Sequence, residues 1–143
     1  MNVVLFLHVL FACVWVGCVL TQGVLERVGD GSDAVRLFIS RAHWRIDQFV
    51  EIPAFVIVLL TGALMWTAVS PTTLIAAMVL VGLVAIVINI YCVHLARMRL
   101  KAAEISDFPR WLEIDGQLHV YGAVLLIAQV AALAIGGNIF VGG

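Results

Sequence analysis

Residues 72–96 read TTLIAAMVLVGLVAIVINIYCVHLA, a run with no Asp, Glu, Lys or Arg. The hydrocarbon core of a bilayer is about 30 Å thick, and a helix needs about 20 apolar residues to cross it. Lipid offers no hydrogen-bonding partner, so every backbone group in such a segment must be satisfied within a helix. Residues 72–96 therefore predict a transmembrane helix.

Three further stretches are apolar enough to span a membrane: residues 3–25, 48–69 and 116–141. In the whole chain 64% of residues are hydrophobic and 12% are charged, whereas soluble domains average about 45–50% apolar and about 25% charged residues. We therefore expect an all-α integral membrane protein, with residues 1–143 forming a single four-helix bundle. The formal net charge of −1 provides no basic surface for nucleic acid, which excludes that class of partner.

The basic residues predict the orientation of the bundle. All eight Lys and Arg residues fall after the first span or after the third: Arg27, Arg36, Arg41, Arg45, Arg97, Arg99, Lys101 and Arg110. Positively charged loops stay on the cytoplasmic side of a membrane. We expect a multi-pass protein of the inner (plasma) membrane with both charged loops in the cytoplasm and both termini outside.

The first charged loop predicts a helix of its own. A Gly29-Asp30-Gly31 turn and Ser32, a candidate N-cap, precede apolar residues that recur at helical spacing: Val35, Phe38, Ile39, Ala42 and Ile46. This pattern is typical of an amphipathic helix. We expect it to lie on the cytoplasmic surface and to run into the second span.

Ionisable residues inside membrane helices are costly, so they are candidates for function. Three of the four histidines fall on the expected cytoplasmic side, near five other polar residues. His43, Asp47 and Glu51 are spaced by four residues, as are Asp115 and His119, and Asn89 and Arg97 flank His94. Residues four apart share a helix face. Three helices are thus expected to present His43, His94 and His119 with Asp47, Glu51, Asp115 and Arg97 in support.

Neutral imidazole binds haem iron, copper or zinc, and a carboxylate can orient the ligating ring. His94 and His119 stand at similar depth on antiparallel spans, so one haem b could be held between them, with His43 as the alternative ligand. Equally open is a solvated interfacial position for His43, and surface ion pairs for Asp47 and Glu51.

His8 lies in the expected outer half of the first span, about 21 Å of helix rise from Gln22. It is too far from the other histidines to share their site. A cofactor on His8 would need a second ligand from Met65, from Met78, or from His8 of a second copy in a homodimer.

The first span, Leu7-His8-Val9-Leu10-Phe11-Ala12-Cys13-Val14-Trp15-Val16-Gly17, resembles the opening helix of CopD-like copper-resistance membrane domains and HemJ-type protoporphyrinogen oxidases. The stretch Glu51-Ile52-Pro53 with Leu60-Thr61-Gly62-Ala63-Leu64 resembles their second helix. The resemblance implies a haem b or copper site with His8 as a ligand. The third span lacks the lysine expected in the HemJ pattern, which argues against that oxidase activity.

Three functions follow as hypotheses. The first is a membrane b-type haem protein that transfers electrons, as an oxidoreductase with a quinone or a partner subunit. The second is a membrane metalloenzyme that uses the His/Asp/Glu set on another transition metal. The third is a copper-handling, CopD-like membrane protein.

Overall fold

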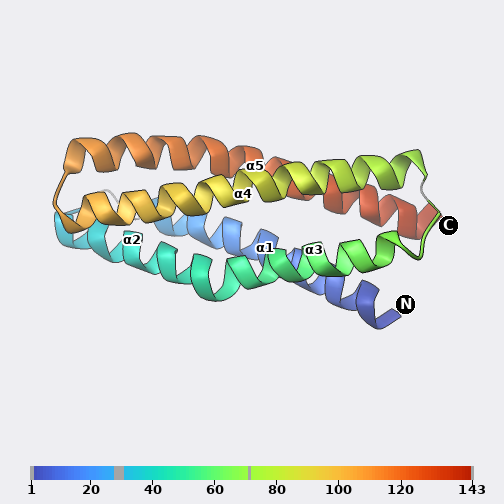
Figure 1. The fold of residues 1–143 in the computed structure, drawn as a ribbon. Coiled ribbons are helices and arrows are strands. Elements are labelled where there is room, and N and C mark those ends of the chain that lie inside the picture. Colours follow the sequence, from blue (N-terminus) through green and yellow to red (C-terminus); the bar gives the residue numbers. More distant parts are fainter. Residues whose placement is uncertain (1, 28–30, 71, 143) are drawn as a thin grey trace.

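The computed structural model describes residues 2–27, 31–70 and 72–142, and no strand occurs among them. The chain folds into long helices that lie side by side (Figure 1). They are α1 (Asn2–Arg27), α2 (Asp33–Ile46), the π-helical turn η1 (Asp47–Glu51), α3 (Ile52–Trp66), α4 (Thr73–Glu104) and α5 (Phe108–Gly142). The prediction of an all-α four-helix bundle is confirmed.

Four helical segments are long and apolar enough to cross a membrane: Val3–Arg27, Asp33–Trp66, Thr73–Glu104 and Phe108–Ile139. The protein is therefore a multi-pass membrane protein. With 32 residues, α4 is about 48 Å long, so it exceeds the hydrocarbon core of about 30 Å. One end of the bundle carries the turn between α3 and α4 together with both chain ends (Figure 1). We call it the α3–α4 end, and the opposite one the α4–α5 end.

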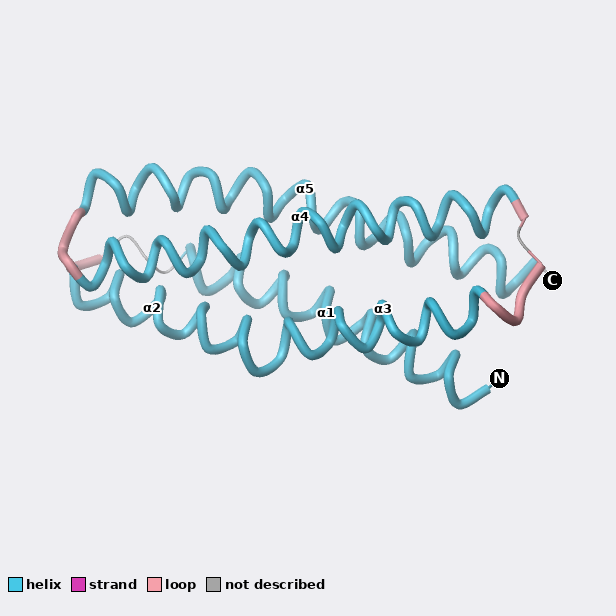
Figure 2. Tube along the Cα trace, viewed as in Figure 1, coloured by secondary structure: helices cyan, strands magenta, loops and turns pink. Residues whose placement is uncertain are grey.

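The expected helix after the first loop forms, but it does not stand apart from the bundle. Ser32 has the extended backbone of an N-cap (φ −62°, ψ 165°), and Ile39, Ser40 and His43 are buried. α2 passes through η1 into α3 and continues the line of that helix (Figure 2). Of the predicted Gly29-Asp30-Gly31 turn, the first two residues lie outside the described residues.

Pro53 explains the π-helical turn. Proline has no N–H, and in a helix its ring meets the carbonyl four residues earlier, here that of Phe49. A wider turn over Asp47–Glu51 relieves this conflict. In an ordinary α-helix, side chains four residues apart are gradually rotated around the helix axis. The wider turn offsets this rotation, so that His43, Asp47 and Glu51 share one face and are all buried.

The core combines small, aromatic and large aliphatic side chains, and many other large aliphatic ones point outward. Ala85 and Ala96 of α4 are each 1% exposed, which allows close approach of the neighbouring helices. Trp15 packs at 6.0 Å from the Phe55 ring. Exposed residues such as Val87 and Ile127 form the lipid-facing surface.

Candidate functional site

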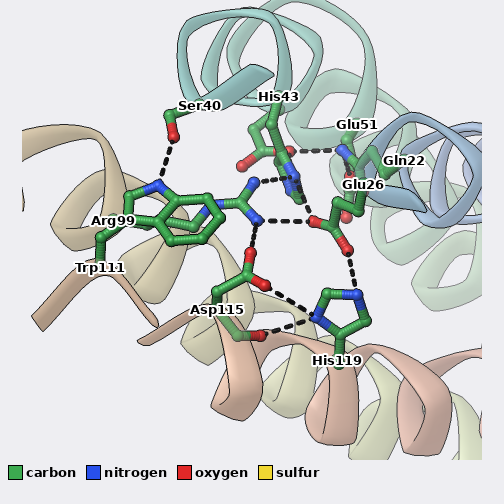
Figure 3. A network of polar contacts seen from close by, with 10 residues as sticks. Gln22, Glu26, Ser40, His43, Glu51, Arg99, Trp111, Asp115 and His119 are labelled. Carbon is green, nitrogen blue, oxygen red and sulfur yellow. Dashed lines mark hydrogen bonds and ion pairs between the residues drawn. The ribbon is translucent and has the colours of Figure 1, made fainter. Parts of the chain in front are cut away.

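The core contains a connected group of polar and ionisable side chains (Figure 3). It lies toward the α4–α5 end, since Arg99 is near the end of α4 and Asp115 is near the start of α5. We call it the polar network; its members are Gln22, Glu26, His43, Asp47, Glu51, Arg99, Asp115 and His119. Every helical segment of the bundle except α3 contributes at least one of them. A buried set of this size in a membrane protein is a functional-site candidate.

Arg99 is the centre of the polar network and is fully buried. Its Nη1 donates to Glu26 Oε1 at 3.1 Å and to Asp115 Oδ1 at 2.5 Å. Its Nη2 lies 2.8 Å from His43 Nδ1. One cation thus ties together α1, α2, α4 and α5.

His43 Nδ1 has two partners of opposite kind. Glu26 Oε1, an acceptor, lies 2.8 Å away, and Arg99 Nη2, a donor, lies at the same distance. Guanidinium only donates and carboxylate only accepts. A partner is therefore in place whether His43 Nδ1 carries a proton or a lone pair.

Asp47 and Glu51 meet at Gln22. The Gln22 Nε2 group donates to Asp47 Oδ1 at 2.6 Å and to Glu51 Oε2 at 2.7 Å. Both acids are almost fully buried, and Asp47 Oδ2 has no hydrogen-bond partner among the described residues. His43 Nε2 lies 3.5 Å from Asp47 Oδ1, which connects this acid pair to the Arg99 side of the polar network.

His119 links the buried groups to the surface. Its side chain is 48% exposed, and its Nε2 lies 3.6 Å from Glu26 Oε2. Its Nδ1 donates to the carbonyl of Asp115 at 2.8 Å, because a carbonyl oxygen only accepts. Nε2 of the neutral ring is then free to take up a proton.

The polar network has more acids than bases. Four carboxyl groups (Glu26, Asp47, Glu51 and Asp115) face one permanent cation, Arg99. Full ionisation with neutral histidines would leave a charge of −3 in the core, which low dielectric disfavours strongly. The polar network must therefore hold exchangeable protons or a bound cation.

A second polar contact lies toward the α3–α4 end. His8 Nδ1 lies 2.9 Å from Thr61 Oγ1, and the Thr61 hydroxyl donates to the carbonyl of Ile57 at 2.6 Å. Thr61 therefore accepts from His8 Nδ1–H, which leaves Nε2 of the neutral ring with its lone pair. Gly62 leaves room for the ring, because a Cβ there would stand 3.3 Å from His8 Cε1.

Between the two sites lie buried amides. Trp15 Nε1 donates to Asn89 Oδ1 at 3.2 Å. Asn89 Nδ2 and both amide atoms of Gln129 have no hydrogen-bond partner in the described part of the chain. These groups leave the middle of the bundle polar but uncharged.

Five of the predicted site residues come together: His43, Asp47, Glu51, Asp115 and His119. Neither His94 nor Arg97 joins them. Both are exposed, because the buried face of α4 carries Asn89, Cys92, Ala96 and Arg99. The structure therefore does not bring His94 and His119 face to face.

Sequence reasoning missed Gln22, Glu26 and Arg99 as members of the site. Glu26 directly follows the first apolar span, and Arg99 was grouped with the loop cations. The spacing of Asn89, Cys92, Ala96 and Arg99 follows one helix face, and this signal could have placed Arg99 in the core.

Among residues 2–27, 31–70 and 72–142, no three His, Cys, Asp or Glu side chains are arranged to hold a metal ion. No protein-family model, curated protein or solved structure matches the chain.

Proposed function

We propose that the protein is a membrane proton relay, in which the polar network takes up protons at the α4–α5 end and passes them between buried acids. The observation that carries this proposal is His43 Nδ1, which has Glu26 and Arg99 at 2.8 Å. A side chain with a partner for both protonation states exchanges a proton without leaving a buried group unpaired.

The distances order the relay. His119 is exposed and takes a proton on Nε2, which faces Glu26 Oε2 at 3.6 Å. Glu26 contacts His43 at 2.8 Å, and His43 faces Asp47 at 3.5 Å. Gln22 holds Asp47 beside Glu51, where carboxyl groups that cannot all ionise share protons.

The path beyond Glu51 runs through neutral groups. Asn89 and Gln129 carry unpartnered amide atoms, and His8 with Thr61 lies closer to the α3–α4 end. Amide and hydroxyl groups can hydrogen-bond to water molecules that carry protons, and they add no charge to the core. These residues are the proposed second half of the relay.

The orientation is part of this proposal. The basic residues favour a cytoplasmic α4–α5 end, with the helix ends at Asn2 and Gly142 on the outer side. Arg41 and Lys101 can each be replaced by cysteine in a variant without native cysteines. Both new cysteines should react with a membrane-impermeant thiol reagent only in inverted vesicles. Labelling of both in intact cells would reverse the orientation.

The relay is tested on the buried acids in liposomes. A potassium diffusion potential should drive proton entry, reported by an internal pH dye. We expect Asp47→Asn and Glu51→Gln to reduce this flux to that of protein-free liposomes. Glu113→Gln is the matched control, because Glu113 is exposed. Equal flux in the control and in both buried variants would refute the relay.

Infrared spectroscopy separates proton storage from proton transfer. Protonated buried carboxyl groups absorb apart from carboxylates and shift in D₂O. We expect such a band at neutral pH in the wild type, weakened by Asp47→Asn or by Glu51→Gln and unchanged by Glu113→Gln. If no such band exists, the polar network balances its charge by other means, which contradicts the relay.

A second candidate function, electron transfer by a haem b or a copper ion, is favoured by His8. A metal-ligating histidine usually donates its other ring N–H to a polar partner, and His8 Nδ1 does so to Thr61. Nε2 would be the ligand, and Met65, Met78 or His8 of a second copy would complete the site. The bound group would supply one-electron chemistry, with a quinone or a partner subunit as the redox partner.

His8 also joins the two segments that carry the resemblance to CopD-like and HemJ-type proteins, since it hydrogen-bonds to Thr61 and its ring lies where a side chain at Gly62 would stand. A haem held by His94 and His119 within one chain does not fit, because His94 is exposed on the far side of α4. A Soret band or bound copper that is lost in His8→Ala but kept in His94→Ala would support this function. If the purified wild type contains a metal that the Asp47→Asn variant lacks, this result would instead favour the metalloenzyme hypothesis.

A further inference from the structure

A basic groove lies on the outside of the bundle, separate from the polar network. Its volume is about 630 Å³, and it is lined by Arg41, Trp44, Arg45, Gln48, Phe49 and Leu100. Five of these residues belong to α2 and η1, and Leu100 belongs to α4. The groove thus follows the line where two helical segments pack together.

Two cations line the groove, and two more lie on the exposed face of the neighbouring α4. Arg41 and Arg45 are four residues apart on α2, and Arg97 and Lys101 are four apart on α4; all four are exposed. The guanidinium of Arg97 lies 6.0 Å from the ring centre of Trp44, which brings Arg97 next to the groove. Glu104 is one acid near them, 3.9 Å from Arg41.

The groove is charged at one end and apolar at the other. Beyond Arg45 toward α3 come Phe49, which is 76% exposed, and Val50, which is 41% exposed. Exposed apolar side chains at this place suit acyl chains, and arginines suit phosphate oxygens. Arg and Trp at the boundary of a membrane span are typical of headgroup contact.

We propose that this groove binds the phosphate headgroup of an anionic phospholipid, with the lipid chains lying along Phe49 and Val50. Arg45 and Arg97 hold the phosphate beside Trp44. The site uses surface residues and no member of the polar network, so it stands or falls independently of the proton relay.

Lipid binding is tested by native mass spectrometry of the protein in neutral detergent, with phosphatidylglycerol against phosphatidylcholine. The double variant Arg45→Gln/Arg97→Gln should bind phosphatidylglycerol about 30-fold more weakly, at about 1 kcal/mol per basic residue. The matched control is Arg27→Gln/Arg110→Gln, which removes two exposed cations outside the groove. It should bind like the wild type, and circular dichroism should show full helix content in both.

Three outcomes would overturn the proposal. The first is equal binding of both lipids by the wild type. The second is an equal loss in the two double variants, which would indicate general surface charge. The third is competition by inorganic phosphate at the same concentration as the lipid, which would show that the chains contribute nothing. Failure to displace the lipid with phosphate supports a lipid site.

Discussion

The two halves of the bundle bury polar groups in different ways. Toward the α4–α5 end, Arg99, His43 and four carboxyl groups form one connected network. Toward the α3–α4 end, the His8–Thr61 pair is a neutral contact between two helices. Charged groups in an apolar core stabilise only as a complete set, whereas a neutral pair is nearly independent of its surroundings.

This difference predicts how much stability each region loses when one of its residues is substituted. Loss of one member of the polar network leaves several buried charges without partners, so its residues are coupled. Loss of Thr61 or His8 affects one contact of about 0.6 kcal/mol. Substitutions should therefore cost most at Arg99, less in the middle of the bundle and least near His8.

The largest effect is expected for Arg99→Met. Methionine fills the space but leaves Glu26 and Asp115 without their cation, and breaking a buried ion pair costs about 3–5 kcal/mol. Unfolding in mixed micelles with rising SDS measures this free energy. Arg97→Met is the control, because Arg97 is exposed on the same helix, and it should change stability by less than about 0.5 kcal/mol. Similar losses in both variants would show that the polar network is not a coupled set.

A smaller effect is expected in the middle of the bundle, for Trp15→Phe. The substitution keeps an aromatic ring near Phe55 but removes the donor to Asn89 Oδ1. A buried acceptor left without a partner costs about 1–3 kcal/mol. The control is Trp66→Phe, since Trp66 is 46% exposed. If Trp15→Phe is as stable as the control, Asn89 has another donor available.

Sequence patterns were sufficient for the helices and for part of the site. Apolar runs predicted four spans because lipid leaves the backbone no alternative to helix, and four-residue spacing placed Asp47 with Glu51 and Asp115 with His119. The rotation of α4 was harder to predict. Its face is set by packing against three other helices, so His94 was expected inside although Arg99 occupies that face.

Depth was also difficult to judge from the sequence. Arg99 lies three residues beyond the predicted end of the third span, which placed it in a loop. The helix instead continues to Glu104, and Arg99 is fully buried between the helices. The burial of this cation depends on the side chains that pack around it, which no hydropathy window detects.

The smallest effect is expected near the α3–α4 end, where two glycines can be compared. At Gly62 a methyl group would stand 3.3 Å from His8 Cε1, whereas at Gly82 nothing lies within 4 Å. Alanine stabilises a helix over glycine by about 0.5–1 kcal/mol, so Gly82→Ala should show this gain. At Gly62 the gain is offset, because the His8 ring must shift and strain a bond to Thr61 worth about 0.6 kcal/mol. The two variants should therefore differ by roughly 0.6 kcal/mol in SDS unfolding. Equal gains would mean that His8 moves freely and is not held in one orientation, which would remove the main structural support for a ligating role of its Nε2.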